Sequence, residues 1–229
     1  MEIKSFTFND YQENTYIVIS GDKCIIIDPG NYYEDENSLI KSYIDERSLI
    51  PQYILITHAH IDHVLGIDFL SKEYLVDVYI PSSEKDIYRN IPSYAPIFGM
   101  GNYKHNDNVI LVKHSDTLAF DEIKINTLFL PGHSPGHLGY FFENENICFS
   151  GDVLFKNSIG RTDLPDVEYF LKKYKRNKSF TYDDRQGIKD FIISTFNTFN
   201  EGKLKNIRCD YSNLRYDRLA KKYRDIIES

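Results

Sequence analysis

The feature that most constrains the fold of this chain is a short apolar run that ends abruptly in a cluster of polar residues. The run is Ile54-Leu55-Ile56, and after Thr57 the chain continues as His58-Ala59-His60-Ile61-Asp62-His63. An apolar run ahead of a polar turn is typical of a buried strand that ends at a loop. Imidazole and carboxylate groups are ligands that zinc and iron accept in proteins. The stretch therefore predicts a strand that delivers metal ligands to a loop at its end.

The composition is typical of a soluble globular protein and argues against several kinds of partner. The chain has 229 residues, of which 41% are hydrophobic and 27% charged, and its net charge is −7. A negative net charge argues against nucleic acid and against an anionic membrane surface as partners. No apolar stretch approaches the roughly 18 residues that span a bilayer, and no signal-peptide pattern is present. The three cysteines are odd in number and far apart, so we expect a cytoplasmic protein with free thiols.

Strand and helix patterns alternate along the chain. Apolar or β-branched runs predict strands at 15–19, 23–28, 53–57, 76–80, 109–112, 123–130, 139–142 and 146–150, and helical spacing predicts helices at 36–48 and 65–74. Ser82 or Ser83 is expected to cap a short helix before Asn90. Residues 91–108 contain two prolines and two glycines without a regular period, which predicts a long loop.

Two later strands end in the same way as the strand before the histidines. The strand predicted at 123–130 is followed by Pro131-Gly132-His133, and the strand at 146–150 is followed by Gly151 and Asp152. Imidazoles and carboxylates gathered at one sheet edge would repel or stay poorly solvated without a cation. These strand ends therefore predict further ligands for the same metal site.

Six stretches of the chain carry a family resemblance. They are Glu13-Asn14-Thr15-Tyr16, Ile27-Asp28-Pro29-Gly30, Thr57 to His63, Leu130 to His137, Phe149 to Phe155 and Ile159 to Pro165. In these stretches, and in their order, the chain resembles the metallo-β-lactamase fold hydrolases, in particular the glyoxalase II-like (hydroxyacylglutathione hydrolase) branch. The resemblance implies an α/β fold, a four-layer αββα sandwich with two mixed sheets. Residues 1–165 would form the core, and residues 166–229 an atypical C-terminal part that completes or abuts the same domain.

The resemblance also implies a set of metal ligands, which are His58, His60, Asp62, His63, His133 and Asp152. Of these, His58, His60 and His133 would bind one ion. Asp62 and His63 would serve a second ion, and Asp152 would bridge both. The implied cofactor is zinc, as one or two ions, with iron as the alternative metal.

Two further residues have implied supporting roles near the metal. Asp28 resembles the carboxylate that orients a ligand histidine, a role that suits it because a ligating imidazole needs its other N–H fixed. His137 would lie close to the site without binding the metal.

One ligand of the family pattern is missing from this chain. Glyoxalase II-like chains have a late Gly-His-Gly motif, whereas all seven histidines here lie at or before His137. Three explanations are open: Asp190 replaces the histidine, the site holds one metal, or a reading-frame error in the source sequence has altered residues 166–193. A missing ligand predicts a firmly held first metal and a labile second one.

The resemblance implies a metallo-hydrolase in which a metal-bound hydroxide attacks a small-molecule thioester such as a hydroxyacylglutathione. Asp152 would fix the bridge between the metals, and Asp62 would orient the nucleophile or receive its proton. Two alternatives are open. A mononuclear iron persulfide dioxygenase would use His58, His133 and Asp152, because two histidines and a carboxylate leave positions open for oxygen and substrate. A degenerate, inactive member of the family is the other.

The long loop at 91–108 is the expected substrate lid. Its aromatic residues Tyr94, Phe98 and Tyr103 would cover the bound substrate. The alternative is that these side chains only pin the loop to the core.

Overall fold

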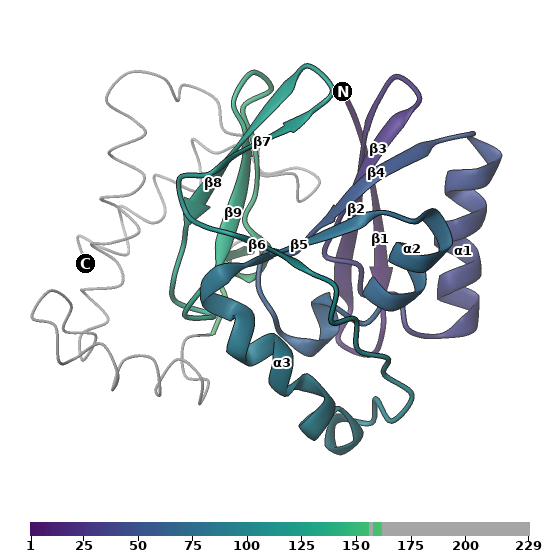
Figure 1. Cartoon of the computed structure of the whole chain (residues 1–229), viewed down its shortest axis with the longest axis vertical. Helices are drawn as coiled ribbons and strands as arrows, with labels where there is room; N and C mark the ends of the chain where they lie inside the picture. The colour runs from purple at the N-terminus through teal and green to yellow at the C-terminus, as the bar shows by residue number, and fades with distance from the viewer. Residues whose placement is uncertain (156–157, 162–229) are drawn as a thin grey trace, which may run out of the picture.

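Two β-sheets pack face to face in this protein, and three helices cover the outer face of the larger sheet (Figure 1). The structure, a computed structural model, describes residues 1–155 and 158–161. The C-terminal part expected at 166–229, and Asp190 with it, lies outside the described residues.

The larger sheet has six strands in sequence order. They are β1 (Glu2–Phe8), β2 (Glu13–Ser20), β3 (Lys23–Ile27), β4 (Ile50–Leu55), β5 (Asp77–Pro81) and β6 (Ile110–Val112). The first three strands form an antiparallel meander, and β3 to β6 run parallel. The parallel crossovers contain α1 (Glu34–Glu46), α2 (Ile67–Tyr74) and α3 (Lys85–Tyr94). All three helices pack on the same face of the sheet, which is the arrangement that right-handed crossovers produce.

The smaller sheet has four described strands, in the order β10-β9-β8-β7. They are β7 (Thr117–Phe120), β8 (Ile123–Phe129), β9 (Leu138–Phe142) and β10 (Ile147–Phe149). A short hairpin of β11 (Leu154–Phe155) and β12 (Ser158–Ile159) follows. Short 3-10 turns lie at Ile61–His63, Ser82–Glu84, Ala95–Phe98 and Gly151–Val153.

The sheets confirm the expected α/β fold with one difference in strand direction. The larger sheet is mixed, as expected, whereas every described pair of the smaller sheet is antiparallel. No helix from the described part of the chain covers the outer face of the smaller sheet. The fourth layer of the sandwich therefore stays a prediction.

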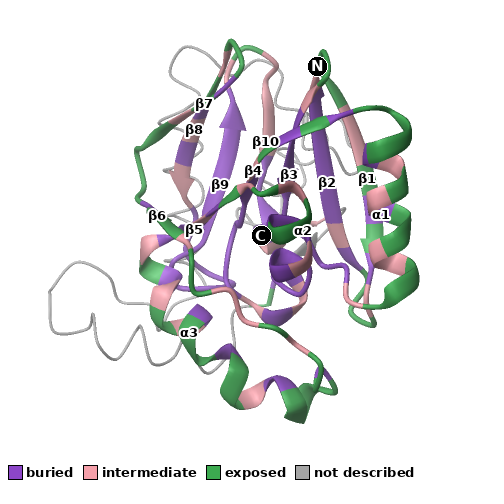
Figure 2. Ribbon diagram, turned by 45° about the vertical axis from the view of Figure 1, so that its right-hand side comes forward, coloured by how far each residue is buried: buried purple, intermediate pink, exposed green. Residues whose placement is uncertain are grey.

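The larger sheet is buried on both faces at β2 and β3, which explains why these strands are nearly continuous apolar runs. Along β2, Tyr16 and Val18 pack between the two sheets, whereas Ile17 and Ile19 pack under the helices. Neighbouring strands alternate in the same way, and Figure 2 shows β2 largely buried while the outward face of α1 is exposed. Two buried faces are typical of a sheet with parallel strands.

The segment expected to be one long loop at 91–108 is partly helical. The helix α3 continues through Pro92 to Tyr94, and a 3-10 turn follows at Ala95–Phe98. The apolar spacing of Tyr88, Ile91 and Ala95 continues across the proline, and all three side chains are buried. The expected serine cap is also absent here, since Glu84 precedes the helix without a side-chain cap.

Two sequence-based expectations concern the membrane and the cysteines. Within the described residues, no helix combines the length and the apolar character needed to cross a membrane. Cys24 and Cys148 are free thiols, and burial raises the pKa of Cys24 to about 12. Cys209 lies outside the described residues.

The position of the histidine loop depends on a buried tyrosine of the smaller sheet. The hydroxyl of Tyr140 donates a hydrogen bond of 2.8 Å to the carbonyl of Ile56, just before the histidines. We expect Tyr140→Phe to lower the free energy of unfolding by about 1–3 kcal/mol, since a buried acceptor loses its donor. Urea titration measures this. Tyr53→Phe is the matched control, because the Tyr53 hydroxyl donates an equally short bond to Ala119 at the surface. Equal effects of the two substitutions would contradict the prediction.

Candidate metal centre

The candidate site lies where the ends of strands from both sheets meet. In the larger sheet, Asp28 follows β3 and the histidine loop follows β4. In the smaller sheet, residues 130–137 follow β8 and Asp152 follows β10. The carboxyl ends of parallel strands commonly form the ligand crevice of an α/β sheet. The chain therefore brings the motifs predicted from the sequence to one edge.

Three histidines form the first group of possible ligands. One ring nitrogen from each of His58, His60 and His133 lies within 4.8 Å of the others. Nδ1 of His60 is 2.8 Å from Nε2 of His133. Nε2 of His58 is buried and has no hydrogen-bond partner among the described residues. A buried ring nitrogen without a partner is costly, so these nitrogens fit a cation in the position expected from the sequence.

A second group shares His58 and adds His63 and Asp152, again with ligand atoms within 4.8 Å of one another. Nε2 of His63 is 3.3 Å from Oδ1 of Asp152 and 3.5 Å from Oδ2 of Asp62. The other carboxylate oxygen of Asp152 is 3.5 Å from Nε2 of His133. Asp152 therefore lies between the two groups, whereas Asp62 lies beside His63 at the margin of the second.

The carboxylate of Asp28 lies beside the ring of His63. Oδ2 of Asp28 is 3.2 Å from Nδ1 of His63, opposite the nitrogen that faces Asp62 and Asp152. The same carboxylate accepts hydrogen bonds from the backbone N–H of Thr57 at 2.7 Å and from the Thr57 hydroxyl at 2.6 Å. A carboxylate in this place fixes the tautomer and the orientation of the imidazole. Asp28 thus stands where the sequence placed an orienting carboxylate.

The protonation states in the site suit a cation. Burial, together with the neighbouring histidines, holds the pKa of His58 well below its usual value and that of His133 at about 4. Burial by itself raises the pKa of Asp152, but His63 and His133 outweigh it and set this pKa at about 2. Near neutral pH, His58 and His133 therefore offer neutral imidazoles and Asp152 an ionised carboxylate, which are the forms that bind metal. Burial lowers the pKa of His63, but the carboxylates of Asp62 and Asp152 outweigh it and hold this pKa well above its usual value, so His63 has to release a proton when a metal binds.

The pKa of His133 predicts how the metal-free protein responds to acid. The pKa of His133 is about 4 in the folded chain, against an ordinary value of 6.5. Because the unfolded chain binds this proton more readily, the stability from His133 is fully present above pH 6.5 and is lost as the pH falls toward 4. We expect the free energy of unfolding of the chelator-treated chain to fall over this range, by about 3 kcal/mol from His133 alone. Urea titrations at several pH values measure it. A constant free energy between pH 6.5 and 4 would contradict the prediction.

His137 lies against the site, as the sequence predicted, and stacks on a ligand candidate. Its ring centroid is 4.6 Å from that of His58, and the two planes differ by 19°. Gly151 makes room for this ring. A Cβ at Gly151 would lie 2.4 Å from Oγ1 of Thr57 and 2.7 Å from Nε2 of His137, and the φ of +46° also favours glycine. Glycine before Asp152 is therefore required by the close approach of two neighbours.

Two buried carboxylates beside the site were not predicted from the sequence. Glu13 on β2 has its Oε1 3.8 Å from Nδ1 of His63, and burial raises its pKa well above the usual value. Glu84 has no exposed surface and contacts both histidine-bearing loops. Glu84 follows the end of β5, just as Asp28 follows the end of β3. This position after a predicted strand is the feature of the sequence from which Glu84 could have been predicted as a site residue.

The aromatic residues expected to form a lid pack mainly on the helical side of the larger sheet. Tyr94 and Tyr103 contact the core beneath the helices, and Phe98 is 51% exposed beside Tyr94. Their role over a substrate stays a prediction.

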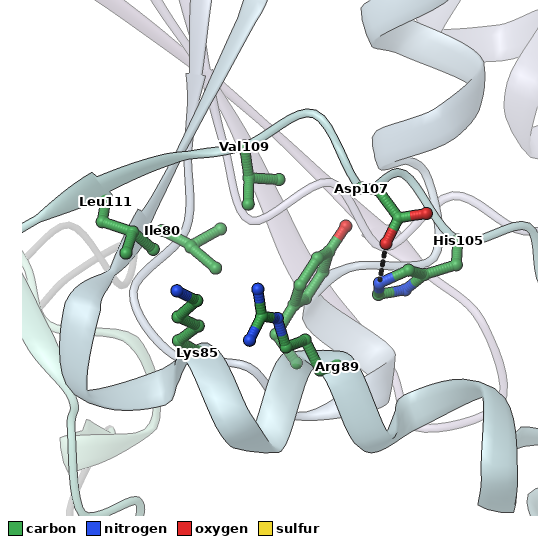
Figure 3. Close-up of a pocket in the computed structure, with 8 residues that line it drawn as sticks. Ile80, Lys85, Arg89, His105, Asp107, Val109 and Leu111 are labelled. Atoms are coloured by element: carbon green, nitrogen blue, oxygen red, sulfur yellow. Dashed lines mark ion pairs between the residues drawn. The ribbon is translucent and has the colours of Figure 1, made fainter.

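A separate pocket of about 220 Å³ lies between α3 and the segment before β6 (Figure 3). Its lining includes Lys85 and Arg89 and none of the metal-ligand candidates.

Comparisons with known proteins agree with this fold. The chain matches the family model of the metallo-beta-lactamase superfamily over residues 8–193. Probable metallo-hydrolase YqgX of Bacillus subtilis is 38% identical over 160 residues, covering 67% of this chain and 71% of that protein. Hydroxyacylglutathione hydrolase GloC of Haemophilus influenzae is 32% identical over 173 residues, covering 74% and 79%.

Two solved structures are also similar. The crystal structure of BLEG-1 B3 metallo-beta-lactamase has a TM-score of 0.65 and 28% identity, and covers 77% of this chain and 85% of that one. The crystal structure of TTHA1623 in a di-iron-bound form has a TM-score of 0.61 and 32% identity, covering 76% and 84%.

Two facing sheets with histidine and aspartate ligand candidates gathered at one edge, together with the similarity to a probable metallo-hydrolase, identify a metal-dependent hydrolase. The chain belongs to the metallo-beta-lactamase superfamily.

Proposed function

We propose that this metal-dependent hydrolase is of the glyoxalase II-like type and cleaves a thioester such as a hydroxyacylglutathione. The observation that carries the proposal is the place of Asp152 between two ligand groups, with His63 on one side and His133 on the other. The similarity to a hydroxyacylglutathione hydrolase supports the choice of substrate class.

The side chains of the site suit this reaction in distinct ways. His58, His60 and His133 would hold the first ion as neutral imidazoles, and His63 and Asp152 would contribute to the second. When bound, zinc or iron would supply an acidified water as nucleophile and a Lewis acid for the substrate carbonyl. A thioester suits the site because a thiolate leaves without prior protonation.

Asp62 would move the proton of the nucleophile. Its side chain is 20% exposed and lies 3.5 Å from Nε2 of His63. A carboxylate that faces both the site and solvent can accept a proton and pass it to water. The side chain of Asp152 is 23% exposed, so it too reaches the open side of the site. These two carboxylates are the catalytic candidates.

We expect about one firmly held metal ion per chain rather than two. The second group has no histidine other than His58 and His63, because no histidine follows His137 in the sequence. Loss of even an outer partner commonly weakens metal binding by about 10–100-fold, and loss of a ligand should cost at least as much. Elemental analysis of the purified chain at micromolar concentration measures the ratio. Two equivalents retained after gel filtration would contradict the prediction.

The proposed reaction is tested by three assays on the full chain, loaded separately with zinc and with iron. Hydrolysis of a hydroxyacylglutathione is the expected activity. Oxygen uptake with a glutathione persulfide, in the absence of thioester hydrolysis, would instead support the iron dioxygenase alternative with His58, His133 and Asp152. A chromogenic β-lactam is the third substrate, because one similar structure is that of a metallo-beta-lactamase. No turnover in any assay would support an inactive member.

A further inference from the structure

Glu84 is a fully buried carboxylate that lies outside the set of ligand candidates. It ends the 3-10 turn Ser82–Glu84, between β5 and α3, and none of its surface is exposed. Within the part of the chain that the structure describes, no lysine or arginine pairs with it. Burying an ionised carboxylate is costly unless hydrogen bonds compensate. The hydrogen bonds that compensate the burial of Glu84 therefore indicate what this side chain does.

Within the described residues, the side-chain hydrogen bonds of Glu84 all go to the two loops that carry the histidines. Its Oε2 accepts from the backbone N–H of Ala59 at 3.0 Å, and its Oε1 accepts from the backbone N–H of Gly136 at 2.5 Å. The hydroxyl of Ser134 lies 2.7 Å from each oxygen. One carboxylate thus joins the loop after β4 to the loop after β8.

The residues that Glu84 holds are sequence neighbours of the ligand candidates. Ala59 lies between His58 and His60, and Ser134 follows His133 directly. The two loops come from different sheets and do not pair as strands. One backbone hydrogen bond, from the N–H of Leu138 to the carbonyl of Thr57 at 2.8 Å, joins them at their bases. Glu84 contacts both, and its position therefore bears on the distance between the first two histidines and the third.

The backbone leaves little room for any other arrangement. A Cβ at Gly136 would lie 2.6 Å from Oε1 of Glu84 and 2.7 Å from the carbonyl carbon of Ser83. Glycine at this place lets the loop after β8 approach the carboxylate closely. Burial raises the pKa of Glu84, but two N–H groups and one hydroxyl all donate to its oxygens, and such partners favour the ionised carboxylate.

We propose that Glu84 is a positioning residue, which clamps the two histidine loops together and so sets the geometry of the first metal group. This inference rests on the proposed function only in assuming that the group binds metal. Outer partners of a metal site typically change metal affinity by about 10–100-fold. Loss of the Glu84 clamp should therefore weaken metal binding by about 10–100-fold.

The test uses Glu84→Gln, which keeps the shape and replaces one acceptor oxygen by a donor. Asp86→Asn is the matched control, because Asp86 is exposed on the first turn of α3. Zinc affinity of the full chain is measured by competition with a chromophoric chelator, well below the melting temperature of each variant. We expect about tenfold or more weaker binding for Glu84→Gln, and no change for Asp86→Asn.

A second readout needs no metal. In the chelator-treated chain, hydrogen exchange of the Ala59 and Gly136 amides should be faster in Glu84→Gln than in the wild type. Unchanged zinc affinity or unchanged exchange would overturn the proposal, even if the melting temperature falls. If the variant does not fold, Ser134→Ala removes one donor and keeps the carboxylate. A smaller loss of affinity is then expected, and no loss would overturn the clamp.

The same experiment separates the clamp from the proposed function. A wild-type chain that binds no zinc and cleaves no thioester would refute the proposed function. The exchange of the Ala59 and Gly136 amides would then decide the clamp by itself.

Discussion

His133→Ala is expected to reduce both zinc affinity and thioester hydrolysis by at least about a hundredfold, more than the usual loss of an outer partner. Nε2 of His133 is 2.8 Å from Nδ1 of His60 and 3.5 Å from Oδ2 of Asp152, so the ring contacts both ligand groups. Its Nδ1 faces the carbonyl of Arg161 at 3.0 Å, which favours the tautomer with a free lone pair on Nε2. Alanine removes that lone pair.

His114→Ala is the control for this substitution. His114 is exposed, its Nδ1 lies 3.0 Å from the hydroxyl of Ser115, and it belongs to neither ligand group. Chelator competition and initial rates measure the two effects. Wild-type affinity and rate in the His133→Ala variant would show that this histidine is not a ligand.

Asp28→Asn is expected to destabilise the fold and weaken the metal site together. The substitution keeps the shape of the side chain but places an NH2 group against the N–H or hydroxyl of Thr57, or against His63. A buried donor that loses its acceptor costs about 1–3 kcal/mol. The freed ring of His63 should lower metal affinity or activity by about 10–100-fold.

Asp121→Asn provides a matched control for the aspartate substitution. Asp121 has a φ of 55° and Asp28 a φ of 50°, so both substitutions test the same backbone conformation. Asp121 instead pairs with Lys23 at the surface, where an ion pair contributes about 0–1 kcal/mol. Urea titration and chelator competition measure the outcomes. An Asp28→Asn variant no different from Asp121→Asn would contradict the orienting role.

The sequence predicted the parts of this site that local pattern determines. An apolar run followed by His58 to His63 predicts the end of a strand, and the same pattern of an apolar run and a polar residue recurs before His133 and Asp152. Family resemblance added Asp28, whose distance to His63 no local pattern reveals. The pairing of β3 with β4 brings these residues together across the crossover that contains α1.

The parts that were missed depend on long-range packing. Glu84 lies in a polar run after a strand, and only the approach of the loops after β4 and β8 makes it part of the site. The helix through Pro92 was missed because proline usually ends a helix, whereas the buried side chains of Tyr88, Ile91 and Ala95 continue the same face. The sharing of His58 between the two ligand groups was not predicted either, because spacing within one loop cannot decide which side chains converge. The role of Asp62 as a ligand of a second ion stays a prediction.

The central claim is that a metal ion binds where the histidine loop meets the loop after β8. Anomalous X-ray diffraction at the zinc edge, from crystals of the zinc-loaded full chain, tests it most directly. We predict an anomalous peak enclosed by ring nitrogens of His58, His60 and His133. A map with no peak at this position, or with zinc bound only elsewhere, would contradict the account.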